Sequence, residues 1–161
     1  VGTFAVQIAK SYGAKVTAVD STMKLYMPRS VGADHVIDYT HEDFTRNGQS
    51  YDLILNVISC RSVFEYERSL TPGGTYVIIG GATQRIFEAM FLAPWIAMAR
   101  GKKMKILLHK PDKNDLNCLG ALFLEGKVKP VIEKQYPLSE VPAAISHLGE
   151  GRAMGKLVIA M

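Results

Sequence analysis

The sequence is short of cysteines and has no long apolar run, and both absences restrict the class of protein. Only two of its 161 residues are cysteine, Cys60 and Cys118, and neither has a C-x-x-C partner. A disulfide framework and a thiolate zinc lobe are therefore not indicated, and we expect no metal site and a reducing compartment, the cytoplasm. The most apolar stretch, residues 89–99, is too short to span a bilayer and contains Pro94, so we expect no membrane span.

An excess of charge of one sign is also missing. The net charge is only +4, and the densest basic cluster, residues 100–105, contains no aromatic side chain. Nucleic-acid surfaces combine basic patches with stacking aromatics, so this cluster is interpreted as a solvated loop between a helix and a strand. We therefore expect no nucleic-acid partner.

Recognisable catalytic motifs are absent as well. No histidine has a spaced Cys, Asp or Glu partner, and no serine or cysteine lies in a nucleophile elbow. The residues considered are His35, His41, His109, His147, Ser59, Ser62 and Cys60. No catalytic residue is assigned to this chain.

Alternating helices and strands are what the chain does contain. Apolar residues recur at helical spacing over residues 3–12, and Gly13 occupies the position of a left-handed helix cap. The β-branched run 16–19 follows and ends at Asp20, which is typical of the second strand of a βαβ dinucleotide-binding unit. Gly2 would then be the last glycine of a G-x-G-x-x-G fingerprint, so we expect the first strand and the earlier glycines to precede residue 1.

The same alternation continues to the end of the chain. The residue pattern predicts strands at 36–39, 53–58, 75–79, 104–108, 131–136 and 156–160, and helices at 21–31, 41–46, 63–70, 83–99 with an interruption at Pro94, 112–125 and 139–148. The apolar character of 53–58 predicts a parallel strand covered on both faces, and 72–74 predicts a turn. The order predicts an α/β fold with a doubly wound, Rossmann-type parallel sheet that lacks its first strand.

Four motifs together carry a family resemblance. They are Gly2–Lys10, Val31–Tyr39, Leu70–Val77 and Gly126–Ile132. Over essentially its whole length the chain resembles the second half of a medium-chain dehydrogenase/reductase of the zinc-free, quinone-oxidoreductase-like branch. The resemblance implies an NAD(P)-binding Rossmann domain at residues 1–126 and, at 127–161, the C-terminal segment of a GroES-like catalytic domain.

The resemblance also implies an activity. NAD(P)H would deliver hydride to a quinone, an enone or another carbonyl compound, and the fragment alone would be inactive because the proton donor comes from the other domain. Two alternatives stay open: a non-catalytic Rossmann module that senses nucleotides or binds proteins, and a methyltransferase-type use of the acid after the second strand. Because the missing strand would leave unpaired edges beside 16–19 and 53–58, we expect a longer polypeptide, strand exchange or a homo-oligomer.

Three cofactor candidates lie at the start of the first helix. The amides of Val1, Gly2 and Thr3 are at the positive end of the helix dipole and suit a pyrophosphate. The alternative is that Gly2 only permits close packing of the helix on the sheet.

Three more candidates follow the next strand and concern the choice of coenzyme. Asp20 favours the ribose hydroxyls of NAD, whereas the resemblance implies that Ser21 and Lys24 lie where relatives hold the 2′-phosphate of NADP. The choice between NAD and NADP is therefore left open. A helix N-cap at Asp20 or Ser21 and a solvated lysine are the structural alternatives.

The remaining candidates end the later strands. The resemblance implies that Tyr39 packs on the adenosine half, with a surface or core tyrosine as the alternative, and that Ile58, Gly80 and Gly81 lie near the nicotinamide. Residues 56–59 depart from the family pattern Asp-x-Val-Gly, so Ser59 could either crowd the cofactor or alter a turn.

Overall fold

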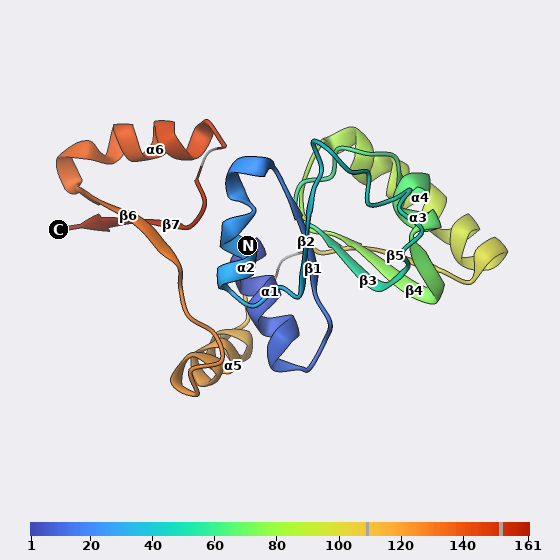
Figure 1. Ribbon diagram of the computed structural model, residues 1–161, viewed down its shortest axis with the longest axis horizontal. Coiled ribbons are helices and arrows are strands. Elements are labelled where there is room, and N and C mark those ends of the chain that lie inside the picture. Colours follow the sequence, from blue (N-terminus) through green and yellow to red (C-terminus); the bar gives the residue numbers. More distant parts are fainter. Residues whose placement is uncertain (109, 152) are drawn as a thin grey trace. The chain divides into compact units, whose positions relative to one another are not determined.

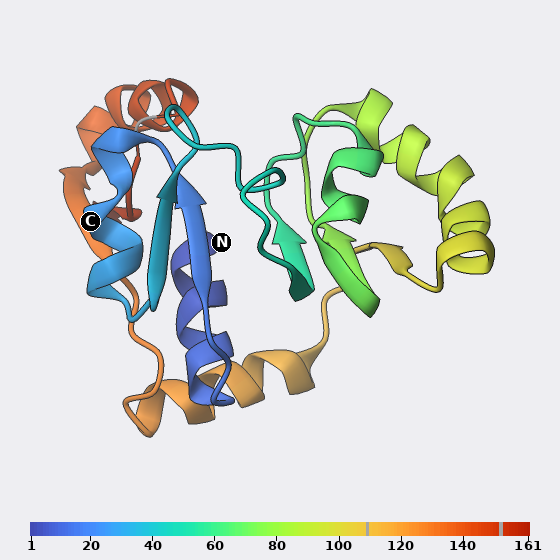
Figure 2. The ribbon, with the colours of Figure 1, turned by 45° about the vertical axis from the view of Figure 1, so that its right-hand side comes forward.

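A computed structural model describes residues 1–108, 110–151 and 153–161, so that His109 lies outside the described residues. The chain divides into two units (Figures 1 and 2). Unit 1 consists of Val1–Asp38 together with Asp112–Met161, and unit 2 is Tyr39–Pro111.

The N-terminal part of unit 1 is a parallel strand pair with its helices. Its elements are α1 Gly2–Ser11, β1 Thr17–Asp20, the 3-10 helix η1 Thr22–Lys24, α2 Tyr26–Ser30 and β2 His35–Asp38. The helix predicted over 21–31 is divided into η1 and α2, and Pro28 lies in the first turn of α2, where its missing N–H has no intrahelical acceptor to lose. Strands β1 and β2 are parallel, with Thr17 opposite His35 and Asp20 opposite Asp38.

The C-terminal part of unit 1 begins at a capped helix. Its elements are α5 Lys113–Leu124, β6 Ile132–Pro137, the 3-10 helix η2 Leu138–Glu140, α6 Val141–Gly149 and β7 Lys156–Ala160. Asp112 is the N-cap of α5 and accepts a hydrogen bond of 2.8 Å from the Asn114 amide. Strands β6 and β7 are parallel.

Glu133 joins the last two strands to helix α6. Its carboxylate accepts hydrogen bonds from the amides of Met154 (2.6 Å) and Gly155 (2.9 Å), and its Oε1 lies 3.0 Å from His147 Nε2. Burial opposes ionisation of Glu133, but these hydrogen bonds outweigh it and lower the pKa of the carboxyl. His147 thus has the acidic partner that its sequence context does not reveal.

Unit 2 is a three-stranded parallel sheet with two helices on one face. Its elements are β3 Tyr51–Asn56, α3 Val63–Arg68, β4 Leu70–Ile78, α4 Thr83–Arg100 and β5 Lys103–Ile106, with the strand order β3-β4-β5. The core lies between the sheet and the helices and consists of Val63, Tyr66, Leu70, Tyr76, Ile78, Ala89 and Ile96. The predicted α/β fold with parallel sheets is confirmed.

A buried carboxylate connects the two helices of unit 2 to strand β5. Glu67 on α3 is 1% exposed, and its carboxylate oxygens lie 2.8 Å from Arg100 Nη1 and from Lys102 Nζ. Lys102 Nζ also donates to the Glu67 carbonyl. The basic cluster extends from the last residue of α4 into β5, and these two side chains neutralise a buried acid and are not simply solvated.

Three expectations for unit 2 are wrong. Residues 41–46 form turns and irregular backbone instead of a helix, because Asp43 Oδ1 accepts hydrogen bonds from the amide and hydroxyl of Thr45 and so competes with a helix. Residues 72–74 lie within β4, where the register shifts between Tyr51 and Leu53 of β3. The face of β3 that carries Leu53 and Leu55 is exposed (53% and 42%), since both helices pack on the opposite face.

The last features of the fold are the neighbours of β1 and β3 and the character of the helices. Within the described ranges, β1 has only β2 beside it and β3 has only β4. No helix in the part of the chain that the structure describes is both long enough and apolar enough to cross a bilayer.

Candidate functional site

The start of α1 presents unused backbone donors. The Val1 carbonyl accepts the amides of Phe4 and Ala5 at 3.1 Å, which leaves the amides of Gly2 and Thr3 without an intrahelical acceptor. No side chain caps α1, and no acid lies in its first turn. A Cβ built on Gly2 would meet no described heavy atom within 4 Å, so close packing is not what requires this glycine in the described residues.

The last residue of β1 and the residues after it form a short polar segment. Asp20 Oδ1 accepts the Ser21 amide at 2.8 Å, and the Ser21 carbonyl accepts the Lys24 amide at 2.8 Å. Ser21 is the N-cap residue of η1 but makes no side-chain capping bond. Lys24 Nζ donates to the Gly151 carbonyl at 2.5 Å, so the lysine is held by the C-terminal segment of unit 1 and not merely solvated.

The register of β1 and β2 adds a residue that the sequence did not single out. Asp38 lies opposite Asp20 at the carboxyl ends of the two strands, and its Oδ2 accepts the Thr22 hydroxyl at 2.5 Å. Ligands of open α/β sheets bind at this edge. The signal that could have found Asp38 was its position as the last polar residue of the predicted third strand.

In unit 2, two of the candidates are strongly exposed. Tyr39 is 53% exposed and Ile58 is 74% exposed. The alternative that Tyr39 is a core tyrosine is therefore wrong. Ile58 is an apolar side chain at the carboxyl end of a parallel strand, the edge at which such sheets bind their ligands.

Gly80 and Gly81 allow two strand ends to come into direct contact. Ser59 N donates to the Gly80 carbonyl at 3.0 Å, and Ser59 forms a parallel bridge with Gly81. Gly81 has a φ of +128°, and a Cβ on it would lie 2.3 Å from Ser59 N. A Cβ on Gly80 would lie 3.0 Å from the Val57 carbonyl oxygen. Gly81 is thus required by the close approach of the two backbones, and a side chain at position 80 would need a shift of the Val57 carbonyl.

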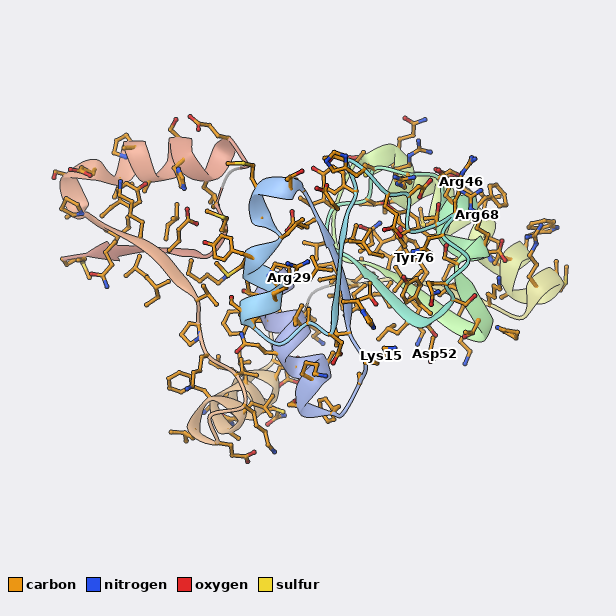
Figure 3. All side chains as sticks on the ribbon, in the orientation of Figure 1. Lys15, Arg29, Arg46, Asp52, Arg68 and Tyr76 are labelled. Carbon is orange, nitrogen blue, oxygen red and sulfur yellow. The ribbon has the colours of Figure 1, made fainter. Side chains whose placement is uncertain are left out.

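Ser59 points into the core of unit 2. It is 2% exposed, and its Oγ lies 3.2 Å from the Tyr76 hydroxyl, to which Asn56 Nδ2 also donates at 2.9 Å. Tyr76 lies among the packed side chains of this unit (Figure 3). The Ser59 hydroxyl thus points away from the sheet edge, which argues against the alternative that it crowds the cofactor.

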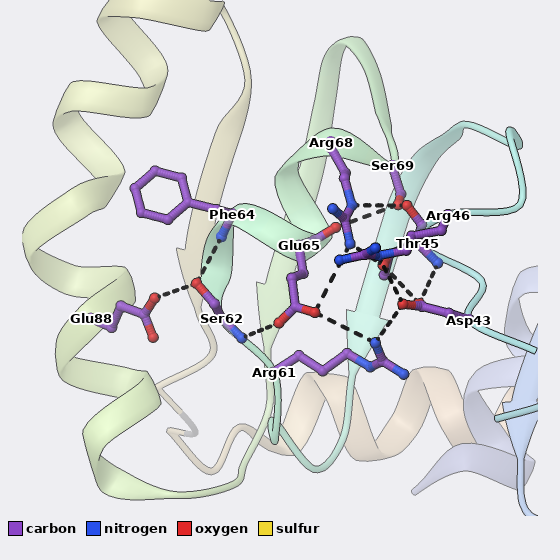
Figure 4. Close-up of polar contacts among 10 residues, drawn as sticks. All are labelled: Asp43, Thr45, Arg46, Arg61, Ser62, Phe64, Glu65, Arg68, Ser69 and Glu88. Atoms are coloured by element: carbon purple, nitrogen blue, oxygen red, sulfur yellow. Dashed lines mark hydrogen bonds and ion pairs between the residues drawn. The ribbon is translucent and has the colours of Figure 1, made fainter. Parts of the chain in front are cut away.

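Ion pairs fix the segment that follows Ser59. Arg61 Nη1 lies 2.9 Å from Asp43 Oδ2 and 3.5 Å from Glu65 Oε1 (Figure 4). Ser62 and Glu65 form a capping box at the start of α3, and Ser62 Oγ donates to Glu88 at 2.7 Å. Burial opposes ionisation of Asp43, but its hydrogen bonds with Thr45 and its pairing with Arg61 lower the pKa of that carboxyl.

The structure thus gathers the candidates within each unit. In unit 1, Asp20, Ser21 and Lys24 share one short segment. In unit 2, Ile58, Gly80 and Gly81 share one sheet edge. Among the described residues, no three His, Cys, Asp or Glu side chains come together so that they could hold a metal ion.

Comparison with known proteins gives consistent matches over nearly the whole chain. A family model described as a zinc-binding dehydrogenase matches residues 31–159. The 2-methylene-furan-3-one reductase of Solanum lycopersicum is 36% identical, over 99% of this chain and 37% of the relative. The chloroplast envelope quinone oxidoreductase homolog of Arabidopsis thaliana is 29% identical, over 99% of this chain and 49% of the relative.

A solved structure shows the same arrangement of the chain. The quinone oxidoreductase from Coxiella burnetii superposes with a TM-score of 0.83 at 26% identity, over all of this chain and 49% of that one. The chain spans about half the length, or less, of the relatives it matches. By its family match, its relatives and its parallel α/β sheets, the chain belongs to the zinc-binding dehydrogenase family of medium-chain dehydrogenases/reductases.

Proposed function

We propose that this chain is the nucleotide-binding part of an NAD(P)H-dependent oxidoreductase that reduces a quinone, an enone or another carbonyl compound. The observation that carries the proposal is the close contact of Gly80 and Gly81 with Ser59, which builds the carboxyl edge of the β3-β4-β5 sheet. Ligands bind at such an edge. Relatives named as a quinone oxidoreductase homolog and an alkenal/one oxidoreductase support the substrate class.

The proposed phosphate site is the start of α1. The amides of Gly2 and Thr3 have no intrahelical acceptor, and neither an acid nor a capping side chain competes for them. A pyrophosphate carries the negative charge that such a helix end favours. With Val1, these residues would hold the phosphates, while the nicotinamide coenzyme itself supplies the hydride.

Coenzyme choice is proposed to depend on the segment after β1. Asp20 would accept the ribose hydroxyls of NADH, and Ser21 and Lys24 would favour the 2′-phosphate of NADPH. Lys24 now donates to the Gly151 carbonyl, so binding a phosphate would require it to exchange this partner.

The remaining cofactor-binding candidates are the residues at the ends of the later strands. Tyr39 would pack its exposed ring on the adenosine half. Ile58 would contact the nicotinamide, and Gly80 and Gly81 would hold the sheet edge beside it through their close approach to Val57 and Ser59. The rival proposal of a non-catalytic module rested on Ser59 and on the absent catalytic half, and the inward direction of the Ser59 hydroxyl removes the first of these two reasons.

Four further properties are proposed with the function. These are zinc-independent catalysis, a domain boundary near Gly126, a homo-oligomer, and a location in the cytoplasm. The proposed compartment rests on the cysteines of the chain, which are both free.

A direct test uses the complete protein. NADH and NADPH are titrated by calorimetry, and the oxidation of the bound form is then followed by absorbance after addition of a quinone or an enone. We expect saturable binding of at least one coenzyme and its oxidation by the substrate. Absence of binding by both coenzymes would overturn the proposal.

A further inference from the structure

Two buried tyrosines lie beneath the turn at the end of β3. Tyr76 on β4 is 1% exposed and Tyr66 on α3 is 4% exposed. Their rings stack with centroids 4.7 Å apart and an interplanar angle of 17°. Burial raises the pKa of Tyr76, and burial followed by the neighbouring Tyr76 raises the pKa of Tyr66 to about 12. Both phenols are therefore neutral hydroxyl groups at neutral pH.

The Tyr76 hydroxyl binds both ends of a four-residue turn. We call residues 56–59 the strand-end turn. Asn56 Nδ2, at its beginning, donates to the Tyr76 oxygen at 2.9 Å, and Ser59 Oγ, at its end, lies 3.2 Å from the same oxygen. Between these two anchors the turn exposes Ile58, at 74% of its surface.

The backbone of the strand-end turn is held from the neighbouring strand end as well. The Ile79 amide donates to the Asn56 carbonyl at 2.8 Å, and the Ala82 amide donates to the Ser59 carbonyl at 3.4 Å. The contact with Gly81 depends on where Ser59 N lies, because this contact has no room for a Cβ. A small shift of Ser59 would therefore change the sheet edge itself.

Packing alone does not explain a hydroxyl at position 76. A phenylalanine ring would fill the same space and stack on Tyr66, and an unpaired hydroxyl in a core is costly. Here the hydroxyl satisfies two polar side chains that would otherwise lie beneath the turn without a partner from β4. Its role is thus tied to the geometry of the strand-end turn.

We propose that Tyr76 is a positioning residue for the nicotinamide half of the coenzyme: through Asn56 and Ser59 its hydroxyl sets the strand-end turn, and thereby the place of Ile58 against Gly81. This inference rests on the proposed function. It assigns to the interior of unit 2 a role in recognising the nicotinamide half of the coenzyme and not the adenosine half.

The test compares two ligands that differ by the nicotinamide. NAD(P)H and the matching ADP-ribose, 2′-phosphorylated if NADPH is the preferred coenzyme, are titrated into the complete wild-type protein and into Tyr76→Phe. We expect Tyr76→Phe to weaken NAD(P)H binding about 5-fold, as expected for a net loss of one or two hydrogen bonds. The affinity for ADP-ribose should stay within about twofold of wild type.

Two control variants separate positioning from general loss of structure. Tyr51→Phe makes the same chemical change at the amino end of β3, away from the strand-end turn. Glu67→Gln weakens the buried ion pairs between α3, α4 and β5. Both controls should leave the ratio of the two affinities unchanged.

The outcomes distinguish failure of the positioning role of Tyr76 from failure of the proposed function. Equal weakening of both ligands by Tyr76→Phe, or no weakening, would overturn the positioning role while leaving the proposed function intact. A wild-type protein that binds neither ligand would overturn the proposed function. If Tyr76→Phe does not fold, Ser59→Ala takes its place, and it should show the same selective loss to a smaller degree. Absence of that selectivity would overturn the positioning role.

Discussion

Single side chains after β1 are expected to set coenzyme preference. Asp20→Ser removes a carboxylate that repels a 2′-phosphate, so the ratio of NADPH to NADH affinity should rise about tenfold. Lys24→Ala removes the cation that would bind this phosphate and should move the ratio the other way by a similar factor. The ratio is measured by calorimetric titration of both coenzymes.

A matched carboxylate controls for net charge. Asp52→Ser removes an acid at the amino end of β3, where no coenzyme contact is proposed, and should leave the affinity ratio unchanged. An unchanged ratio in Asp20→Ser and Lys24→Ala alike would mean that the ribose site has been misplaced.

The buried acid of α3 is expected to matter for stability. Glu67→Gln leaves Arg100 and Lys102 without their carboxylate, and we expect the free energy of unfolding to fall by about 3 kcal/mol. This is the low end of the range for a broken buried pair, because the Arg100 side chain is 51% exposed and can be hydrated. Urea unfolding followed by circular dichroism measures the change.

An exposed ion pair provides the comparison. Glu125 and Lys127 lie 2.7 Å apart, but their side chains are 53% and 51% exposed. Glu125→Gln should leave the urea midpoint unchanged, since exposed pairs contribute little. If Glu67→Gln and Glu125→Gln lowered the free energy of unfolding equally, burial would not be what makes the Glu67 ion pairs strong.

At the scale of elements, the β6-β7 pair is expected to weaken in acid. Hydrogen bonds hold the pKa of Glu133 below its usual value of 4.5, so this carboxylate stabilises the folded state fully above that pH. The contribution should be lost as the pH falls below 4.5 and through the lowered pKa of the folded state. The thermal unfolding midpoint, measured from neutral pH downward, should fall less steeply in Glu133→Gln than in wild type. Parallel curves would contradict the assignment.

Local sequence signals predicted most elements because their causes are local. Gly13, Asp112 and the apolar spacing of residues 3–12 define helix ends and faces within a few residues, and α1 and α5 lie where they were expected. The helix at 41–46 failed because Asp43 binds Thr45 instead, a competition that helical spacing does not display. The extent of β4 depends on its pairing with Tyr51 and Leu53, and such long-range register is not visible in the sequence of the strand.

In the candidate site, too, residues with local signals could be predicted and residues that depend on long-range contacts could not. The resemblance indicated Gly80 and Gly81 from their place at the end of a predicted strand, which is a local signal. The partners of the Tyr76 hydroxyl could not, since they are 17 and 20 residues away and the tyrosine stands in an apolar strand that reads as ordinary core. Asp38 was missed because only the register with β1 places it opposite Asp20.

At the scale of the whole molecule, the proposed zinc-independent catalysis makes a prediction about metal removal. Treatment of the complete protein with a chelator, followed by desalting, should leave NAD(P)H-dependent reduction of a quinone or an enone within about 20% of the untreated rate, because the coenzyme supplies the hydride. The rate is followed by the absorbance of the reduced coenzyme. Loss of activity that added zinc restores would place the protein in a metal-dependent branch.

The contact between Gly81 and Ser59 has a consequence for laboratory evolution of this sheet edge. Any side chain at position 81 would place its Cβ 2.3 Å from the Ser59 amide, so a library that randomises this codon would consist mainly of misfolded members. Ile58, directly before Ser59, is 74% exposed and can accept many side chains at little structural cost. A search for variants with new substrate preferences should therefore keep Gly80 and Gly81 and randomise position 58.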